Sequence, residues 1–294
     1  MTSRVHAPSA SAELPVLRLQ NVSFIRERVT ILDSMSLTVM AGQHCAVLGP
    51  NGCGKTTLLR ILTREIYPSV DNHGQVGTVE VLGQSRWELA ELRKQIGVVS
   101  QALDQSFSLD RTGRMTASQA VATGLTGVQL AHFSPHLEHG VLRGDVRQAV
   151  IDRLTEVGMA DRIEQRLETM STGQRRRVMI ARALILNPSV LVLDEPTTGL
   201  DMVARHDLLM SLADWIESTS VTVFWVTHHL DEILPTIDHV VLLDRGRIMV
   251  DGNRQEALTD ENLTRAFRRQ VCVEWSSTGQ SAVRIQDQPS PGSC

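Results

Sequence analysis

The amino-acid sequence predicts an α/β protein, with a mostly parallel sheet flanked by helices and a helical region inserted into it. Residues 16–101 consist of short apolar or alternating segments separated by turn residues, which is typical of strands. From about residue 102 to 186 the apolar residues recur at helical spacing instead. Strand and helix patterns then alternate up to about residue 267, as in parallel sheets covered by helices.

The individual elements follow from local patterns. HCAVLG (His44–Gly49) is a short apolar run and predicts a buried strand, after which KTTLLRIL predicts a helix that begins at Lys55. DVRQAVIDRLTEVGM (Asp145–Met159) carries Val146, Val150 and Leu154 at helical spacing. Further elements are predicted, in chain order, for the strand Ile96–Gln101, the helix Gln174–Leu186, and the strands Ser189–Glu195 and Val221–His228.

Composition narrows the function classes. The chain has 294 residues, with 29 Lys and Arg against 33 Asp and Glu, so its formal net charge is -4. This balance argues against a nucleic-acid-coating protein, and a hydrophobic content of 42% predicts a folded core. The longest apolar runs, such as Val221–Val226, are far shorter than the roughly 20 residues that span a bilayer. The four cysteines lack the spacing of a metal site and are expected to be reduced thiols.

The chain is expected to form one folded region between two flexible arms. Residues 1–15 are rich in Ser, Ala and Pro and lack the apolar segment of a secretory signal, so we expect a cytoplasmic protein. We expect the folded region to cover residues 16–270, with its helical part at about 102–186. Residues 271–294 are expected to form a flexible C-terminal tail.

Four of the predicted strands end in polar groups. One leads into the glycine-rich loop at Gly49, and the others end at Gln101, at Asp194 with Glu195, and at His228. Because open α/β sheets bind ligands outside the carboxyl ends of their strands, we expect these four ends to lie together. Each residue could cap its own strand, but that explanation requires four coincidences.

The loop GPNGCGKTT fits the phosphate-binding pattern G-x-x-x-x-G-K-[ST] between a strand and a helix. Its glycines allow backbone N–H groups to point at phosphate oxygens at a helix N-terminus. Lys55 provides a charge for the β and γ phosphates, and Thr56 a hydroxyl for Mg²⁺. The residues predicted to bind the nucleotide are Gly49, Pro50, Asn51, Gly52, Cys53, Gly54, Lys55, Thr56 and Thr57.

The run SVLVLDEP is an apolar strand followed by two carboxylates, and a strand apolar on both faces belongs in the middle of a parallel sheet. Asp194 is predicted to hold Mg²⁺, directly or through water, and Glu195 to polarise the attacking water as a general base. The alternative is that Asp194 and Glu195 are simply solvated side chains at the end of a strand. The presence of the phosphate loop in the same chain argues against this alternative.

These motifs resemble those of the ATP-binding cassette (ABC) family of transport ATPases over nearly all of residues 16–260. Beyond the loop and the LVLDE strand, the resemblance rests on four stretches: VVSQ with Gln101, MSTGQRRR from Met170, TTGLD ending at Asp201, and VTHH with His228. It implies a P-loop NTPase core with an N-terminal antiparallel β subdomain and an inserted helical subdomain. The chain looks most similar to stand-alone bacterial ATP-binding subunits.

The resemblance also implies roles for individual residues. Ser171, Thr172, Gly173 and Gln174 form the signature that closes over the γ-phosphate held by a second cassette, and Asp201 communicates across that interface. Gln101 senses Mg²⁺ and the attacking water, and His228 contacts the γ-phosphate. The partners implied are ATP, a second copy in a homodimer and separate transmembrane permease subunits at the cytoplasmic face of the membrane, with no nucleic acid expected.

The sequence departs from the family pattern at two positions. The signature usually reads LSGGQ, and here Thr172 stands where glycine is common, which adds a Cβ and a hydroxyl where backbone approaches phosphate. Arg26 stands where an aromatic residue usually stacks on adenine. Arginine can itself stack on an aromatic plane, and Phe24 is a nearby candidate.

Weaker signals receive structural interpretations. Residues 175–177 are three arginines that we interpret as the solvated start of a helix, and His132, His136 and His139 as surface histidines. Cys53 lies near a helix N-terminus that can lower a thiol pKa, so one hypothesis is that alkylation inhibits hydrolysis and MgATP protects. The alternative is a small side chain tolerated where only the backbone matters.

The sequence therefore predicts the ATP-hydrolysing subunit of an ABC transporter. One alternative is a soluble ABC ATPase in DNA repair or translation, against which stand the single cassette, the missing coiled-coil insertion and the lack of a basic stripe. A second alternative is a kinase that phosphorylates a small molecule. Glu195 argues against it, because a base that activates water would make a kinase hydrolyse its ATP.

Overall fold

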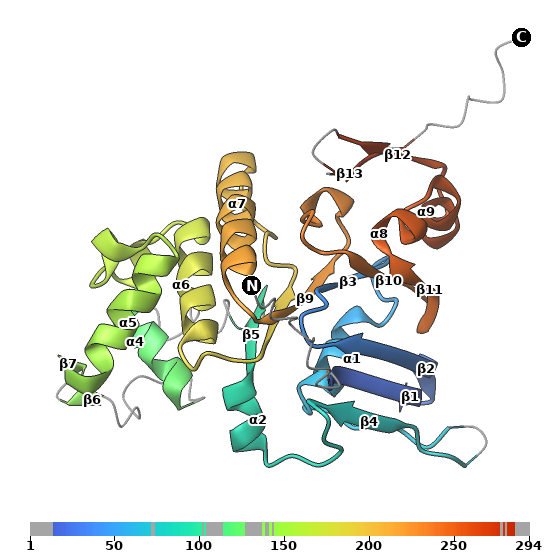
Figure 1. Ribbon diagram of the computed structural model, residues 1–294, viewed down its shortest axis with the longest axis horizontal. Helices are drawn as coiled ribbons and strands as arrows, with labels where there is room; N and C mark the ends of the chain where they lie inside the picture. Colours follow the sequence, from blue (N-terminus) through green and yellow to red (C-terminus); the bar gives the residue numbers. More distant parts are fainter. Residues whose placement is uncertain are drawn as a thin grey trace, which may run out of the picture.

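The computed structural model describes residues 14–71, 74–101, 103, 114–126, 137–138, 141–142, 144–276, 279 and 281–285 (Figure 1). Over these residues the α/β class predicted from the sequence is confirmed. No helix in the described ranges is both long and apolar enough to cross a membrane.

A six-stranded sheet forms the centre of the molecule. In spatial order its strands are β11 (Arg247–Asn253), β10 (His239–Asp244), β3 (Cys45–Leu48), β9 (Thr222–Thr227), β8 (Val190–Asp194) and β5 (Ile96–Ser100). Only the pairing of β11 with β10 is antiparallel, and all other neighbours in this sheet run parallel. Parallel strands place their carboxyl ends at one edge, where the predicted site residues follow.

Both faces of the sheet are buried over its inner strands β10, β3, β9 and β8, which explains why these strands are largely apolar, whereas the edge strand β11 is mostly exposed or half-buried. In β8, Leu191 and Leu193 belong to one core, and Val190 and Val192 belong to the other. This alternation follows from the two-residue period of a strand, whose successive side chains point to opposite faces.

One core lies between the central sheet and an antiparallel sheet near the N-terminus. The strands of that sheet, in spatial order, are β2 (Val29–Met40), β1 (Pro15–Arg26) and β4 (Thr78–Val81). Helix α1 (Lys55–Leu62) contributes Leu58, Ile61 and Leu62 to this core. The N-terminal antiparallel subdomain that the family resemblance implied is therefore present, and β1 already begins at Pro15.

The other core joins the opposite face of the sheet to the helical region, drawn in green and yellow in Figure 1. The helical region consists, in chain order, of α4 (Ala117–Ala122), η2 (Thr123–Leu125), β6 (Leu137–Glu138), β7 (Val141–Leu142), α5 (Gly144–Glu156), η4 (Ala160–Arg162), η5 (Leu167–Thr169) and α6 (Thr172–Leu184). Val146, Val150 and Leu154 are buried, as the helical spacing predicted. Helix α2 (Leu89–Gln95) leads from the N-terminal region into β5.

The expectation of a flexible tail from residue 271 is wrong for residues 271–275 and 281–285, which form strands. After α7 (Met202–Ser218), η6 (Leu230–Glu232), α8 (Arg254–Ala257) and α9 (Asp260–Phe267), the chain forms an antiparallel hairpin of β12 (Val271–Trp275) and β13 (Ser281–Ile285). The hairpin is held by buried Arg254, which donates to Ser281 Oγ at 3.2 Å and lies 5.2 Å from the Trp275 ring centre.

Candidate active site

The four strand ends singled out in the sequence are neighbours in the structure. Leu48 of β3 pairs with Thr227 of β9, so Gly49 and His228 follow at adjacent positions. On the other side, Asp194 of β8 pairs with Val226 of β9 and with Ser100 of β5, after which Gln101 follows. The parallel sheet thus brings together groups that are far apart in the chain. The side chain of Gln101 is exposed, and the following segment lies largely outside the described residues.

Glycine is required where the loop after β3 passes close to other backbone. A Cβ at Gly49 would lie 2.3 Å from the carbonyl oxygen of Leu243, and one at Gly54 would lie 2.6 Å from a methyl of Leu32. At Gly49 the obstacle is backbone, so a larger residue would displace the loop. At Gly54 the obstacle is the end of a side chain, but the backbone φ of 112° also disfavours any residue other than glycine.

Lys55 is buried and folded back onto its own loop. Its Nζ donates to the carbonyl oxygens of Gly49, at 2.8 Å, and Pro50, at 3.1 Å. No side chain among the described residues caps the first turn of α1, which also lacks an acidic residue. Uncapped N–H groups and the helix dipole make this end of α1 attractive to an anion. Thr56 in the same turn is exposed, and Thr57 is half-buried.

Cys53 is a buried core residue, not merely a tolerated small one. Its side chain is 3% exposed and packs with the core around α1. Burial raises the pKa of the Cys53 thiol, and the nearby charge of Lys55 opposes this effect without reversing it. The structure therefore opposes the hypothesis of a reactive thiol at this position.

Asp194 and Glu195 leave β8 in different environments. Burial raises the pKa of the Asp194 carboxyl to about 6, the charge of Glu195 adds to this effect, and Lys55 opposes it. Glu195 adopts a left-handed backbone conformation, with φ 49, and its N–H donates to the Val226 carbonyl oxygen at 2.9 Å. A non-glycine residue in this conformation stores on the order of 1 kcal/mol of strain, and such residues cluster at functional sites.

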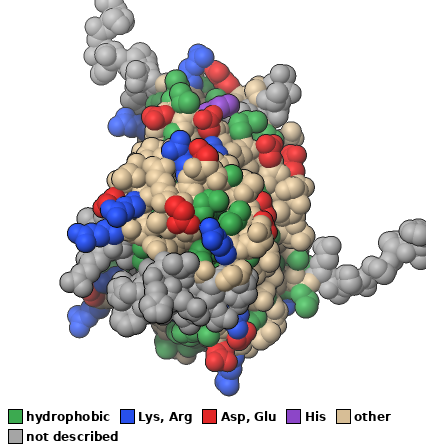
Figure 2. Space-filling model, turned by 90° about the vertical axis from the view of Figure 1, so that its left-hand side faces the viewer, with side chains coloured by type: hydrophobic (Ala, Val, Ile, Leu, Met, Phe, Trp, Pro, Cys, Tyr) green, Lys and Arg blue, Asp and Glu red, His purple; other side chains and the backbone are tan. Residues whose placement is uncertain are grey.

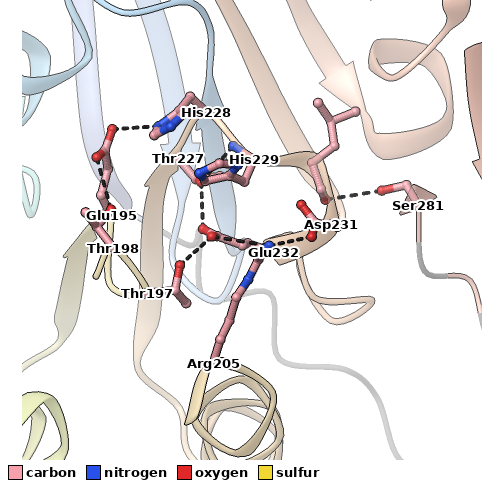
Figure 3. Close-up of polar contacts among 11 residues, drawn as sticks. Glu195, Thr197, Thr198, Arg205, Thr227, His228, His229, Asp231, Glu232 and Ser281 are labelled. Atoms are coloured by element: carbon pink, nitrogen blue, oxygen red, sulfur yellow. Dashed lines mark hydrogen bonds and ion pairs between the residues drawn. The ribbon is translucent and has the colours of Figure 1, made fainter. Parts of the chain in front are cut away.

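The Glu195 carboxylate has partners on two sides. His228 Nδ1 lies 2.9 Å from Oε1, and the Thr198 hydroxyl donates to Oε2 at 3.3 Å (Figure 3). Because an ionised carboxylate only accepts hydrogen bonds, Nδ1 of His228 carries the proton in this contact. The side chains of both residues remain partly exposed, at 26% for Glu195 and 29% for His228. The pair is therefore preorganised and still open to a ligand.

A buried carboxylate that the sequence analysis missed lies next to this pair. Glu232 of η6 is 2% exposed and accepts hydrogen bonds from the hydroxyls of Thr197 and Thr227. In the sequence Glu232 directly follows Asp231, and such a pair of acidic residues predicts an exposed position rather than a buried one.

The predicted signature residues lie at the start of α6. The Ser171 hydroxyl accepts a hydrogen bond from Gln174 N at 3.3 Å, and the Gln174 side chain accepts from Ser171 N in return. Asp201 caps α7 in a similar way, with Ala204 N donating to it at 2.9 Å. A Cβ at Gly173 would lie 3.3 Å from the Ala204 side chain, so the two helix starts pack together.

This second group of residues lies on the other side of the sheet from the phosphate loop. Helix α6 belongs to the core on the helical side, whereas α1 belongs to the core on the opposite face, and Figure 1 shows the two helices on either side of the central strands. The structure thus brings together the predicted residues at the strand ends and leaves Ser171–Gln174 apart from them.

The remaining predictions have mixed outcomes. The interpretation of residues 175–177 as a solvated helix start is wrong for Arg176, which is 1% exposed and donates to the Thr198 carbonyl oxygen. Burial follows because this face of α6 packs against the turn after β8. The Arg26 side chain is exposed, and its Nε lies 3.8 Å from Glu27 Oε1. Phe24 is half-buried. His132, His136 and His139 lie outside the described residues.

Figure 2 shows one face of the molecule with the basic and acidic side chains interspersed across the described surface. Such a surface matches the nearly balanced charge of the whole chain. On this face the described residues form no extended basic stripe of the kind that tracks a nucleic-acid backbone.

Comparisons with known proteins agree with this geometry. A family model described as ABC transporter matches residues 32–198. The chain is similar to the uncharacterised ABC transporter ATP-binding protein YlmA of Bacillus subtilis, with 35% identity over 89% of this chain and 94% of that protein. It is also similar to the cobalt import ATP-binding protein CbiO of Rhodobacter capsulatus, with 34% identity over 79% of this chain and 76% of that protein.

Among solved structures, cbiO1 from Clostridium perfringens, described as part of the transporter complex cbiONQ, has the same fold. Its TM-score is 0.69 at 24% identity, and the match covers 86% of this chain and 94% of that one. This likeness concerns the fold alone.

Proposed function

The chain belongs to the ABC transporter family as an ATP-binding ATPase subunit, and we propose that it binds MgATP between two copies and powers separate membrane subunits. The observation that carries this proposal is the alignment of four strand ends, which gathers Lys55, Asp194, Glu195 and His228 at one edge of the sheet. A triphosphate placed there meets a cation, an uncapped helix end and a positioned carboxylate.

In this proposal the loop after β3 binds the phosphates. Lys55 exchanges the carbonyl oxygens of Gly49 and Pro50 for phosphate oxygens, so its ammonium group keeps its hydrogen bonds when the nucleotide binds. The uncapped N–H groups of α1 add to the attraction. The nine residues from Gly49 to Thr57 form this cradle.

The donor set at the strand ends fits Mg²⁺. The Asp194 carboxylate, the Thr56 hydroxyl and the Gln101 amide provide the hard oxygen ligands that Mg²⁺ prefers, and Mg²⁺ usually takes few protein ligands beside substrate phosphates. A half-buried carboxylate with its pKa raised to about 6 also gains from a nearby cation, which would favour its ionised form. Bound there, the ion would neutralise charge on the β and γ phosphates.

Glu195 is proposed as the general base for water. Its carboxylate accepts a proton from the water as the water oxygen bonds to the γ-phosphorus, and the bond from that phosphorus to the β–γ bridging oxygen breaks to release ADP. His228 holds Glu195 through Nδ1–H, and the imidazolium form of the ring would also donate Nε2–H to the γ-phosphate. The distance of 2.9 Å supports this pairing.

A second copy is proposed to complete the site. Ser171, Thr172, Gly173 and Gln174 begin α6 on the far side of the sheet from their own phosphate loop, so their role at a γ-phosphate requires a partner chain. Asp201 caps α7, whose Ala204 lies next to Gly173, so it would lie at the same interface. We place the resulting dimer on the cytoplasmic face of a membrane, against permease subunits.

The experiment that tests this function uses the Glu195→Gln variant. Loss of the base should block hydrolysis but preserve nucleotide binding, so MgATP should accumulate in a stable dimer that is visible by size-exclusion chromatography with light scattering. A matched control is Glu217→Gln, an exposed glutamate near the end of α7, which should not trap a dimer. A Glu195→Gln protein that stays monomeric at saturating MgATP would contradict the proposal.

The membrane partner is tested by affinity purification from solubilised membranes. Recovery of a polytopic membrane protein supports a transport role. Recovery of nucleic acid without any membrane protein would favour the DNA repair or translation alternative.

A further inference from the structure

The contacts around the Glu195 and His228 pair form a closed ring. His228 is bonded to Glu195 Oε1, and its chain neighbour Thr227 is bonded to Glu232 Oε2. Glu232 Oε1 is bonded to Thr197, whose chain neighbour Thr198 is bonded to Glu195 Oε2. The dashed lines in Figure 3 trace these contacts. Glu195 and Glu232 thus sit at opposite sides of a ring that spans the ends of β8 and β9.

We propose that Glu232 is a positioning residue for ATP hydrolysis: its buried carboxylate clamps Thr197 and Thr227 and thereby fixes Glu195 and His228 relative to each other. This inference rests on the proposed roles of Glu195 and His228. Glu232 itself does not touch the substrate, because it lies 2% exposed beneath the strand ends.

The chemistry of the clamp requires a carboxylate. A carboxylate only accepts hydrogen bonds, so both threonine hydroxyls must donate to it, and their rotors are fixed in one direction. The Thr227 hydroxyl oxygen also accepts a hydrogen bond from His229 N at 3.0 Å. The hydroxyl therefore donates to Glu232 and accepts from the turn that follows β9. An amide at position 232 would offer one acceptor oxygen in place of two. One of the two threonines would then lose its anchor.

The charge of Glu232 is compensated by Arg205 of α7. Arg205 Nη2 lies 3.4 Å from Glu232 Oε1 and also pairs with Asp231. A buried carboxylate without partners is costly, and two hydroxyl donors with one guanidinium make the burial tolerable. Because α7 begins at the cap Asp201, Arg205 also connects the ring to the helix proposed to lie at the partner interface.

The test separates hydroxyl bonding from packing at position 227. Thr227→Val keeps the shape of the side chain but loses the hydroxyl, whereas Thr227→Ser keeps the hydroxyl but loses the methyl. Misplacement of catalytic groups by about 1 Å can lower turnover about 100-fold. We therefore expect the Val variant to lose about ten- to 100-fold in kcat with an unchanged KM for ATP, and the Ser variant to stay within about twofold of the wild type.

The chain offers a matched control in the same strand. Thr222, at the other end of β9, is also buried, and its hydroxyl accepts from Gly42 N at 2.9 Å. Thr222→Val should lower the melting temperature about as much as Thr227→Val but leave kcat unchanged. Glu232→Gln should also lower kcat, because the amide leaves either Thr197 or Thr227 without its anchor.

The outcomes distinguish this inference from the proposed function. Wild-type kcat in a folded Thr227→Val protein would overturn the positioning role, as would an equal loss of kcat in Thr227→Ser and Thr227→Val. If Glu195→Gln abolishes hydrolysis while Thr227→Val does not, only the role of Glu232 fails. If Glu195→Gln hydrolyses ATP at the wild-type rate, the assignment of the base fails, and the role of Glu232 fails with it.

Discussion

His228 Nδ1 lies 2.9 Å from Glu195 Oε1, although 33 residues separate the two along the chain. The contact exists because β8 and β9 are parallel neighbours, so the residues that follow them emerge at one edge. It fixes both the histidine tautomer and the direction of the carboxylate. The first prediction follows from this relationship.

Loss of the histidine should act through the glutamate. His228→Ala should lower kcat by about 100-fold, in the range typical of a lost catalytic contact, and Glu195→Gln by at least as much. Since the two side chains form one unit, the double variant should be little worse than Glu195→Gln alone. Steady-state ATPase assays on the three variants measure this coupling. Fully multiplicative losses would show that the two residues act independently.

Asp194 should make hydrolysis sensitive to moderate acid. Its pKa is raised from 3.8 to about 6, so the folded protein disfavours the ionised form that Mg²⁺ requires. As the pH falls through about 6, the apparent affinity for Mg²⁺ should therefore fall. The measurement is the Mg²⁺ dependence of ATPase activity between pH 5 and pH 8. An apparent affinity that stays constant over this range would contradict the prediction.

The raised pKa of Asp194 should also make the nucleotide-free protein more stable toward unfolding at low pH, whereas it weakens Mg²⁺ binding there. A raised folded-state pKa means that the stability contribution of Asp194 is fully present below pH 3.8 and is lost as the pH rises through about 6. Asp194→Asn cannot ionise, so at pH 8 it should raise the free energy of unfolding of the nucleotide-free protein by on the order of 1 kcal/mol. Thermal melts at pH 8 and pH 5 should show a larger gain at pH 8. An equal gain at both values would rule out ionisation as the cause.

Cys53 should resist alkylation in the folded protein. Its thiol is buried and its pKa is raised, whereas Cys272 is half-exposed. A thiol reagent should label Cys272 in the native protein and Cys53 only after unfolding, as peptide mass spectrometry can show. Rapid labelling of Cys53 in native protein would indicate that the loop opens on the timescale of the reaction.

The fold and much of the candidate site follow from local sequence patterns. The strand ends at Gly49, Gln101, Asp194 and His228 were predicted to meet, because apolar strands in an α/β pattern form parallel sheets with a common carboxyl edge. The buried positions of Val146 and Leu154 followed from the helical period in the same way.

The missed features depend on tertiary contacts. The burial of Glu232 needs hydroxyls from two strand exits, and the burial of Arg176 needs the carbonyl of Thr198, none of which a local pattern reveals. The C-terminal hairpin was missed because its strands are short and its anchor, Arg254, lies on another element. Short segments of this kind gain most of their stability from packing.

Removal of the hairpin should therefore destabilise the protein. Truncation after residue 270 takes away the Ser281 partner of Arg254 and the contact of Ser281 with the Leu230 carbonyl oxygen. Arg254 keeps its hydrogen bond to the Ile233 carbonyl oxygen but loses the one to Ser281 and its contact with the Trp275 ring. A lost hydrogen bond costs about 1 kcal/mol, so the melting temperature should fall by a few degrees. Differential scanning calorimetry measures this change. A truncated protein that melts at the wild-type temperature would show that the hairpin is only loosely attached.

The most direct test of the proposed two-chain site is a disulfide between two differently tagged copies. One copy carries Asn51→Cys in the phosphate loop and the other Ser171→Cys at the start of α6, both with Cys272 and Cys294 replaced by Ser. With MgATP and a mild oxidant, a covalent dimer containing both tags should form, and it should be absent without nucleotide. Failure of this dimer to form at saturating MgATP, in protein that hydrolyses ATP before oxidation, would contradict a site shared between two copies.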